Sequence, residues 1–540
     1  MQKECQIHQL DKAIKEIIDI LRQSNNITTR KLNGIKKNVA KKYHLCRWPR
    51  NYEILSKMTP ELRERFGNYI LNKPVRSISG VSVVAVMTKP LPCPGRCIYC
   101  PGGTPPTLDM ATPKSYTGLE PAARRARQLD YDPYKQVLFR IKQLEKIGHK
   151  PSKIEVIIMG GTFLATPKHY KDFFIRGIYE GLLGRRYRSL EIDDLQKLLE
   201  TTKYRLVGLT IETRPDFCYE THVDEMLKYG TTRVEIGVQT LDESVLEFIQ
   251  RGHDVNAIRK AFRIARDSAL KICAHMMLNL PGMTPEKDIK IFEQLFKDPN
   301  FRPDMLKIYP TAIIKGTKLY ELWKNGEYKP YSEETLLNVI ANIKKKIPPW
   351  VRIQRVQRDI PINIVEGGYK SGNIRQKVKA LMKKKGWKCR CIRCREVGHV
   401  FAKEGKLPEE RNIRLVTRKY KASGGEEIFL SFEDTKLDIL IGFLRLRKPS
   451  DNAHRSEIDS NTMLIRELHV YGIQVPIGER HLNGWQHRGY GLKLLHEAER
   501  IAEEDYDAKR IIIISGIGVR EYYRRFGYRL LGPYMFKKLG

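Results

Sequence analysis

The sequence predicts an α/β protein in which a partial (βα)6 barrel of the TIM type precedes a small α/β domain. Two observations support this fold class. Six short runs rich in Val, Ile and Met alternate with longer helical stretches, which is typical of a parallel sheet that curls into a barrel. At 540 residues the chain is also too long for one hydrophobic core, so two or more domains are expected.

The first region, residues 1–77, is predicted to be a basic appendage that binds nucleic acid and begins with a helix. Aliphatic side chains are spaced as on one helical face, at Leu10, Ile14, Ile17, Ile18 and Leu21. The next stretch, 28–50, interleaves Lys and Arg with Tyr43 and Trp48. This combination suits a phosphate backbone and stacked bases.

The barrel is predicted to span residues 78–369. Its strands are expected at 82–88, 154–160, 206–212, 233–239, 272–280 and 305–310, with helices between most of them. In such barrels the chemistry lies on loops at the carboxyl ends of the strands. The stretch PCPGRCIYCPGG, residues 92–103, follows the first strand and is therefore placed where a functional loop belongs.

A linker with several cysteines, 370–405, is expected before the second domain at 406–540. That domain should contain a hairpin at 426–434 and 437–448, a strand at 462–472, a loop running into a helix at 486–505, a strand at 509–515 and a closing segment at 519–539.

The net charge of +36 favours a polyanionic partner, and nucleic acid before any other. A merely Lys-rich surface is the alternative. No apolar run is long enough to cross a bilayer, and the N-terminus lacks the apolar core of a signal peptide. We therefore expect a cytoplasmic protein that does not bind membranes.

Cys93, Cys97 and Cys100 are spaced C-x3-C-x2-C. In a reducing compartment such a group indicates metal or cluster ligands better than disulfides. Three thiolates leave one iron of a cubane cluster without a protein ligand. The loop resembles that of the radical S-adenosylmethionine (radical SAM) enzymes, which implies a 4Fe–4S cluster and S-adenosylmethionine. A structural zinc loop is the alternative.

Other residues are candidates at the mouth of the barrel. Gly160 and Gly161 follow the second strand where the radical SAM family carries Gly-Gly-Glu, although Thr162 replaces the acid here. Glu212 and Gln239 end the third and fourth strands and could bind ribose or carboxylate groups of a cofactor, or form structural ion pairs around the barrel rim. Lys307, beside the sixth strand, could bind a phosphate or carboxylate at the mouth, or extend outward into water.

A second cofactor site is indicated by QHRGYG, which precedes a helix. Glycines let a pyrophosphate approach the free N–H groups at a helix start. The turn resembles that of the GCN5-related acetyltransferases, which implies acetyl-CoA bound by Gln486, His487, Arg488, Gly489, Tyr490 and Gly491.

The same resemblance places Tyr523 near the thioester sulfur, where it can protonate the leaving thiolate, with Tyr522 as a neighbouring candidate. Both could instead be core aromatics. Glu467 and His469 are candidate bases and cofactor contacts, or ordinary strand residues.

The middle cluster, KCRCIRCREVGH, contains Cys389, Cys391, Cys394 and His399. Closely spaced Cys and His residues of this kind predict a small structural zinc site that holds the linker. His399 is the weaker ligand.

The order of the two cofactor domains resembles the family of Elongator catalytic acetyltransferase subunits, in the archaeal stand-alone form. Motifs that carry the resemblance run along the chain: CIYCPGG, SYTGLEP, VIIMGGTF, IETRPD, RVEIGVQT, LKIYPT, RVQRDIP, RELHVYG, QHRGYG and GPYM. The resemblance implies a tRNA wobble-uridine carboxymethyltransferase that acts on the anticodon region. Other Elongator subunits or a homodimer stay open as partners.

In the implied mechanism an adenosyl radical takes hydrogen from the acetyl methyl group, and the resulting carbon radical adds to C5 of the uridine. Hydrolysis of the thioester then releases CoA. Because the acetyl group must reach the cluster, the two sites are expected to face one shared cleft. A protein lysine (histone) acetyltransferase with a structural iron–sulfur domain and an RNA-binding scaffold without turnover are the alternatives. A positively charged protein repels lysine-rich tails and attracts tRNA.

Overall fold

The fold was obtained as a computed structural model that describes residues 2–24, 27–70, 78–102, 111–472, 485–486 and 488–540. The chain forms two compact units. The first comprises Met1–Ile78 and Phe139–Pro151, and the second comprises Ser79–Leu138 and Ser152–Gly540.

The helices before residue 78 belong to the first unit: α1 (Gln2–Gln23), α2 (Thr29–Lys42), α3 (Asn51–Lys57) and α4 (Pro60–Ile70). The predicted helical stripe is confirmed, since Ile14, Ile17 and Leu21 of α1 are buried with Ile54 and Phe66. Helix α1 extends well beyond the predicted 10–21 on its N-terminal side, where charged and polar residues hide the apolar period.

Seven parallel strands form a half-barrel in the second unit, in the order β1-β2-β3-β4-β5-β6-β8. They are β1 (Ser82–Met87), β2 (Lys153–Met159), β3 (Arg205–Thr213), β4 (Arg233–Gln239), β5 (Lys271–Leu278), β6 (Met305–Pro310) and β8 (Arg352–Arg355). All six predicted strands are confirmed. The seventh, β8, was missed because its four residues, RIQR, are short and largely polar.

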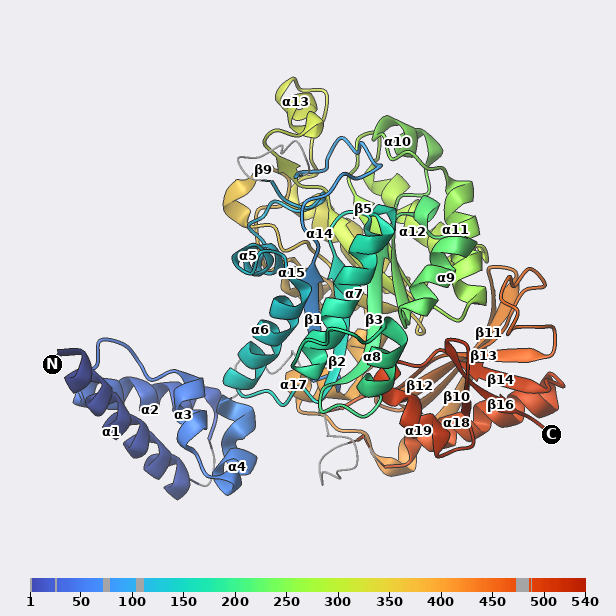
Figure 1. The fold of residues 1–540 in the computed structure, drawn as a ribbon. Helices are drawn as coiled ribbons and strands as arrows, with labels where there is room; N and C mark the ends of the chain where they lie inside the picture. The colour runs from blue at the N-terminus through green and yellow to red at the C-terminus, as the bar shows by residue number, and fades with distance from the viewer. Residues whose placement is uncertain (1, 25–26, 71–77, 103–110, 473–484, 487) are drawn as a thin grey trace. The chain divides into compact units, whose positions relative to one another are not determined.

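Helices cover the outer side of the half-barrel, as α7, α9, α11 and α12 show in Figure 1. The helices between the strands are α5 (Pro121–Gln128), α6 (Pro133–Lys146, which contains residues of both units), α7 (Lys168–Leu183), α8 (Ile192–Leu199), α9 (Glu220–Lys228), α10 (Glu243–Phe248), α11 (Val255–Asp267), α12 (Pro285–Lys297), α13 (Lys318–Lys324) and α14 (Glu333–Lys345). A small ribbon of β7 (Ile313–Ile314) and β9 (Val365–Gly367) accompanies them.

The expected linker is mostly helical: α15 (Ile374–Lys384), α16 (Ile392–Arg395) and α17 (Val397–Glu404). A second sheet follows in the order β10-β11-β12-β13-β14-β16-β15. Its strands are β10 (Ile413–Ala422), β11 (Gly425–Asp434), β12 (Ile439–Lys448), β13 (Thr462–Val470), β14 (Arg510–Ile513), β15 (Arg529–Leu531) and β16 (Tyr534–Lys538), with helices α18 (Tyr490–Arg500) and α19 (Arg520–Arg524).

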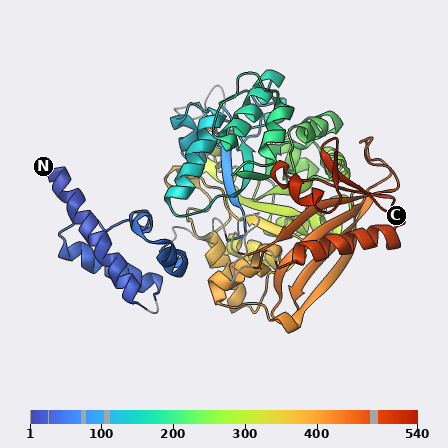
Figure 2. The same cartoon turned by 60° about the horizontal axis from the view of Figure 1, so that its bottom comes forward.

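The second sheet is antiparallel except where β13 pairs with β14 in parallel. Figure 2 shows it in orange to red, with α18 lying along it. Strand β10 was missed by sequence because its alternating charged residues hide a strand period on an exposed edge.

The half-barrel and the second sheet belong to one compact unit because buried ion pairs join them. Arg447 of β12 bonds Asp267 at the end of α11 at 2.6 Å, and Arg466 of β13 bonds Asp304 before β6 at 2.9 Å. Arg466 also reaches Glu427 of β11 at 2.9 Å. Since these guanidiniums are fully buried, each one depends on its carboxylate partner.

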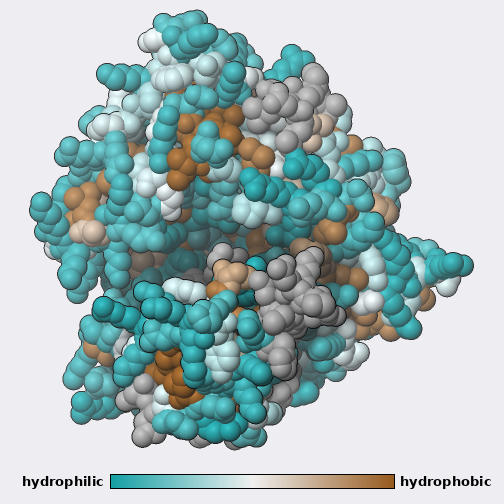
Figure 3. All heavy atoms as spheres, turned by 90° about the vertical axis from the view of Figure 1, so that its left-hand side faces the viewer, coloured by the Kyte–Doolittle hydropathy of each residue, from teal (hydrophilic) through white to brown (hydrophobic). Residues whose placement is uncertain are grey.

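No helix of the described residues is both long enough and apolar enough to cross a membrane. The face in Figure 3 is mostly hydrophilic and carries small separate hydrophobic patches, in keeping with the net charge of +36.

Candidate functional site

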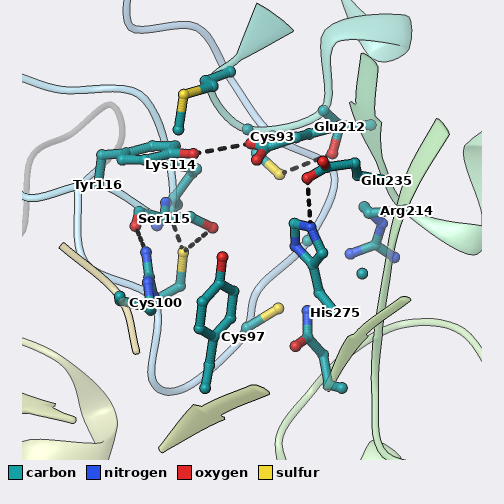
Figure 4. A pocket seen from close by; sticks show the side chains of 18 of the residues that line it. Cys93, Cys97, Cys100, Lys114, Ser115, Tyr116, Glu212, Arg214, Glu235 and His275 are labelled. Atoms are coloured by element: carbon teal, nitrogen blue, oxygen red, sulfur yellow. Dashed lines mark hydrogen bonds and ion pairs between the residues drawn. The ribbon is translucent and has the colours of Figure 1, made fainter. Parts of the chain in front are cut away.

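One pocket lies at the carboxyl ends of the barrel strands, and we call it the cysteine pocket. It has a volume of about 120 Å³ and is lined by the loop that follows β1 and by the strand ends. Figure 4 shows Cys93, Cys97 and Cys100 around it, with Glu212, Glu235 and His275 from the strands. The loop after the first strand is thus placed as the sequence predicted.

Two arginines compensate negative charge at the thiol of Cys97. Arg251 Nη1 lies 3.3 Å from the sulfur, while Arg251 Nη2 donates to the carbonyl of Gly237 at 2.7 Å. Burial raises the pKa of Cys97, but the guanidiniums of Arg251 and Arg214 outweigh burial, so the pKa is lowered overall. The site therefore favours a thiolate, which is the form that binds metal.

The donor set of this pocket fits an iron–sulfur cluster. Cys93, Cys97 and Cys100 all line this pocket, and three thiolates of one loop would leave one iron of a cubane cluster without a protein ligand. Arg214 Nη1 is buried without a hydrogen-bond partner among the described residues. Such a group can donate to cluster sulfur or to a bound cofactor.

The cofactor candidates predicted at the strand ends lie in this pocket. Gly161 and Thr162 line it, and the hydroxyl of Thr162 is 3.6 Å from the sulfur of Cys93. Glu212 and Gln239 line it from β3 and β4. Gly160 lies beside them with a φ of 120°, and a side chain there would collide with Thr88.

Lys307 does not lie free at the barrel mouth, and it does not extend into water. It is buried between two carboxylates, bonding Glu235 and lying 3.3 Å from Glu212. Burial lowers the pKa of Lys307, but Glu235 and Glu212 outweigh this and raise the pKa overall. The carboxylates of Glu212 on β3 and Glu235 on β4 bind the ammonium of Lys307. The sequence of β6 alone could not predict these contacts.

A second pocket of about 520 Å³ lies at the amino ends of the same strands, and we call it the glycine-turn pocket. Its barrel side includes Lys153, Gly208, Arg233 and Lys271, near the starts of β2 to β5. The cysteine pocket and the glycine-turn pocket share no lining residue. The described residues therefore do not show the expected shared cleft, and the second sheet packs against the opposite end of the barrel.

Buried ion pairs run through the barrel between the two pockets. Arg233 pairs with Glu155 in the glycine-turn pocket and lies 3.3 Å from Glu235 in the cysteine pocket. Glu235 in turn bonds Lys307, and His275 is 2.8 Å from the same carboxylate. The interior of the barrel is thus polar along its length.

The predicted glycine turn lies in the second pocket. Gln486, Gly489, Tyr490 and Gly491 line it, and Gly489 caps α18 with a φ of 84°. Arg488 is not among the lining residues and lies 3.5 Å from Glu410.

His487, another predicted contact, falls outside the described residues. The amide of Gln486 joins both sides of the pocket, since it donates to Val470 at 3.1 Å and accepts from Lys153 at 3.1 Å.

Glu467 and His469 line the glycine-turn pocket but are engaged with neighbours. Glu467 accepts from Arg445 at 2.9 Å; burial raises its pKa, but Arg445 outweighs burial, so the pKa is lowered and the carboxylate is a weak base. Nε2 of His469 is 2.9 Å from the carbonyl of Ser79, and burial lowers the pKa of its imidazole. His469 is therefore the neutral, and better, candidate base.

Tyr522 and Tyr523 both line this pocket, and they differ in their surroundings. Tyr523 belongs to the hydrophobic core with Tyr528. The hydroxyl of Tyr522 lies 3.3 Å from the point that a β-carbon on Gly491 would occupy. The geometry therefore favours Tyr522 as the hydroxyl near a bound thioester.

The thiols of Cys389, Cys391 and Cys394 lie within 4.8 Å of one another, as around a single ion. They fit zinc through three thiolates. His399 is not part of this group, because its Nε2 is 3.0 Å from Glu396. Nε2 of His399 is buried without a hydrogen-bond partner among the described residues, and His399 as fourth ligand stays a prediction.

Sequence reasoning missed several residues of both pockets. Arg251, Tyr116 and Arg358 line the cysteine pocket, and Lys153 lines the glycine-turn pocket. Burial lowers the pKa of Lys153 to about 8. The motif RVQRDIP contained Arg358, whereas Arg251 and Lys153 occur in no motif and required the fold.

Family models match three parts of the chain: the ELP3 N-terminal domain at 10–78, the Radical SAM superfamily at 92–295 and the Radical SAM C-terminal domain at 303–384. A radical SAM domain implies S-adenosylmethionine and a 4Fe–4S cluster, which the three thiols of the cysteine pocket would hold.

A Methanocaldococcus jannaschii protein named tRNA uridine(34) acetyltransferase is 49% identical, over 97% of each chain. Human Elongator complex protein 3 is 46% identical, over 98% of this chain and 96% of its own. The solved structure of archaeal Methanocaldococcus infernus Elp3, lacking its N-terminus, matches with a TM-score of 0.76 at 47% identity and covers 86% of this chain and 100% of that one. The chain therefore belongs to the Elongator complex protein 3 family.

Proposed function

We propose that this chain is an enzyme that modifies uridine 34 of tRNA with an acetyl group taken from acetyl-CoA. The supporting observation is that one compact unit holds a three-thiolate pocket and a glycine-turn pocket at opposite ends of one barrel. The names of the relatives, tRNA uridine(34) acetyltransferase and Elongator complex protein 3, agree with this substrate.

In the cysteine pocket, a cluster with S-adenosylmethionine would supply a carbon radical that can remove hydrogen from a methyl group. Cys93, Cys97 and Cys100 would hold the cluster. Arg251 and Arg214 offset its negative charge. Glu212 and Gln239, which line the pocket, would bind hydroxyl or amino groups of the cofactor.

In the glycine-turn pocket, acetyl-CoA would place its pyrophosphate on the turn before α18. Tyr522 would protonate the leaving thiolate, and His469 would accept a proton from the water that hydrolyses the thioester. We propose 5-carboxymethyluridine as the product, since the acetyl carbons then become a carboxymethyl group on C5.

Release of CoA in the presence of different acceptors tests this proposal. Anaerobic protein with acetyl-CoA, S-adenosylmethionine and reductant should release CoA faster when tRNA is added and should not respond to a lysine-rich histone peptide. Stimulation by the peptide and none by tRNA would instead favour a protein lysine acetyltransferase.

A further inference from the structure

A third cavity, of about 600 Å³, opens beside the cysteine pocket, and we call it the arginine groove. One wall is the segment from Gln354 to Ile362, which includes the end of β8. The other wall is formed by the start of α15 and by Arg393 of α16. No step proposed above uses this groove.

Four arginines and one carboxylate are the charged groups that line the groove: Arg355, Arg358, Arg375, Arg393 and Asp359. Only Arg355 pairs with the carboxylate, at 2.9 Å. Arg358 and Arg375 donate to the backbone carbonyls of Ser115 and Gln354, and among the described hydrogen bonds and ion pairs none involves Arg393.

This arrangement differs from that of the arginines in the interior. Arg445, Arg447 and Arg466 each bond a buried carboxylate. Three groove arginines have no described carboxylate at ion-pair distance. The thiols of Cys389, Cys391 and Cys394 act electrostatically on Arg375, and Glu396 and Cys391 act on Arg393, so the positive charge of the groove is only partly compensated. Guanidinium groups at such a place suit phosphate, which they bind with two parallel hydrogen bonds.

The start of α15 adds to the same anionic preference. Gly372, Ile374, Arg375 and Gln376 line the groove, and α15 has no acidic residue in its first turn. The side chain of the N-cap residue, Asn373, makes no capping hydrogen bond. The N–H group of Gln376 donates to the carbonyl of Asn373 at 2.9 Å, so within the described hydrogen bonds only the N–H groups of Ile374 and Arg375 are available to an anion.

The groove continues into the cysteine pocket. Arg355, Arg358, Asp359 and Ile360 line both cavities. An extended polyanion that lies in the groove would therefore present its neighbouring unit to the three thiols. A nucleic acid strand has this form, with one phosphate for each base.

We infer that the arginine groove binds the phosphodiester groups of the RNA strand next to the nucleotide that enters the cysteine pocket. This inference rests on the proposed RNA substrate and adds the site that positions it. Because the contacts are to phosphate, they set position and affinity without reading bases.

The test is tRNA binding by the full chain over a series of salt concentrations. Arg375→Gln and Arg393→Gln should each weaken binding about tenfold and lower the slope of log affinity against log salt by about 0.7. Lys384→Gln removes the same charge from an exposed position on α15 outside the groove, and it should change affinity less than twofold. Arg375→Lys should keep the slope.

Equal effects of Arg375→Gln and Lys384→Gln would overturn the inference, as would displacement of tRNA by poly-glutamate of equal charge at equal concentration. Arg393 lies between two zinc-ligand candidates, and Arg393→Gln could therefore fail to fold. In that case the result for Arg375→Gln tests the inference. The assay measures tRNA binding and not modification. The inference about the groove can therefore be overturned while the wild-type protein still modifies tRNA, and it can hold even if the modification differs from the one proposed.

Discussion

At Cys97, a buried thiol is kept ionisable by a neighbouring charge. Arg251 Nη1 is 3.3 Å from the sulfur, and the pKa of the thiol is lowered although burial opposes ionisation. The carbonyl of Gly237 fixes the same guanidinium. Arg251 thus prepares a thiolate before any iron arrives.

Replacing Arg251 with Gln should raise the pKa of Cys97, because it removes the guanidinium that outweighs burial at this thiol. Alkylation of the Cys97 peptide, followed by mass spectrometry across pH in iron-free protein, measures this change. Arg251→Lys keeps the charge and should shift the pKa less. An unchanged alkylation profile for Arg251→Gln would show that the arginine does not control the thiol.

Tyr522 and Tyr523 of the glycine-turn pocket differ in the residues that surround them. Tyr522→Phe should slow tRNA-stimulated release of CoA about a hundredfold, because it removes a proton donor beside the turn. Tyr523→Phe removes a hydroxyl from a core position and should slow release much less. The single-turnover rates of CoA release by the two variants are compared at equal acetyl-CoA occupancy. A slower rate for Tyr523→Phe than for Tyr522→Phe would assign Tyr523 as the proton donor.

At the scale of elements, α12 contains a buried acid in its first turn. Asp288 accepts from the backbone of Asn279 at 2.8 Å and from the Tyr331 hydroxyl at 2.9 Å. Burial raises the pKa of Asp288 to about 7. The folded state therefore binds a proton more tightly than the unfolded chain.

This raised pKa gives a stability contribution that is complete below about pH 4 and is lost as pH rises through about 7. Asp288→Asn keeps an acceptor for both donors and removes the titration. At pH 8 the variant should be the more stable protein by about 1 kcal/mol or more. Thermal unfolding at pH 5 and pH 8 measures the difference in stability between the variant and the wild type. This difference should be larger at pH 8, and an equal difference at both pH values would refute the buried titration.

Helices and strands with a clear pattern of hydrophobic residues could be predicted from the sequence. The others depend on contacts with neighbouring elements. The strands β2 and β4 are dominated by Val and Ile, so their bounds were predicted to within a residue. Strands β8 and β10 are held in place by neighbouring strands, and their charged sequences carry no such signal.

The candidate sites follow the same rule. Closely spaced cysteines and the glycine turn depend on local sequence and were found. Arg251, Lys153 and the buried position of Lys307 depend on side chains that the fold brings from distant strands. The end of the barrel that the second sheet covers is likewise set by packing and could not be predicted from the sequence.

At the scale of the whole molecule, buried ion pairs join the half-barrel to the second sheet. Asp304 bonds Arg466 at 2.9 Å, with Arg445 also nearby. Removal of one partner leaves an uncompensated buried charge. The barrel and the second sheet are therefore expected to unfold together.

Asp304→Asn should destabilise the second unit by about 3–5 kcal/mol, seen as earlier loss of both parts in hydrogen exchange. Asp451→Asn, at an exposed position in the turn after β12, serves as the control and should have little effect. Protection lost in the second sheet alone would show that the two parts unfold independently.

The central claim is that the thiols of the cysteine pocket and the acetyl group from the glycine-turn pocket act on one tRNA base. The most direct measurement is nucleoside mass spectrometry after anaerobic incubation of tRNA with S-adenosylmethionine, reductant and acetyl-CoA labelled with carbon-13 in both acetyl carbons. Wild-type protein should yield a uridine that carries both labelled carbons, and Cys97→Ser should yield none while still binding tRNA. A labelled uridine from Cys97→Ser, or labelled protein lysines and unlabelled tRNA from the wild type, would contradict the account.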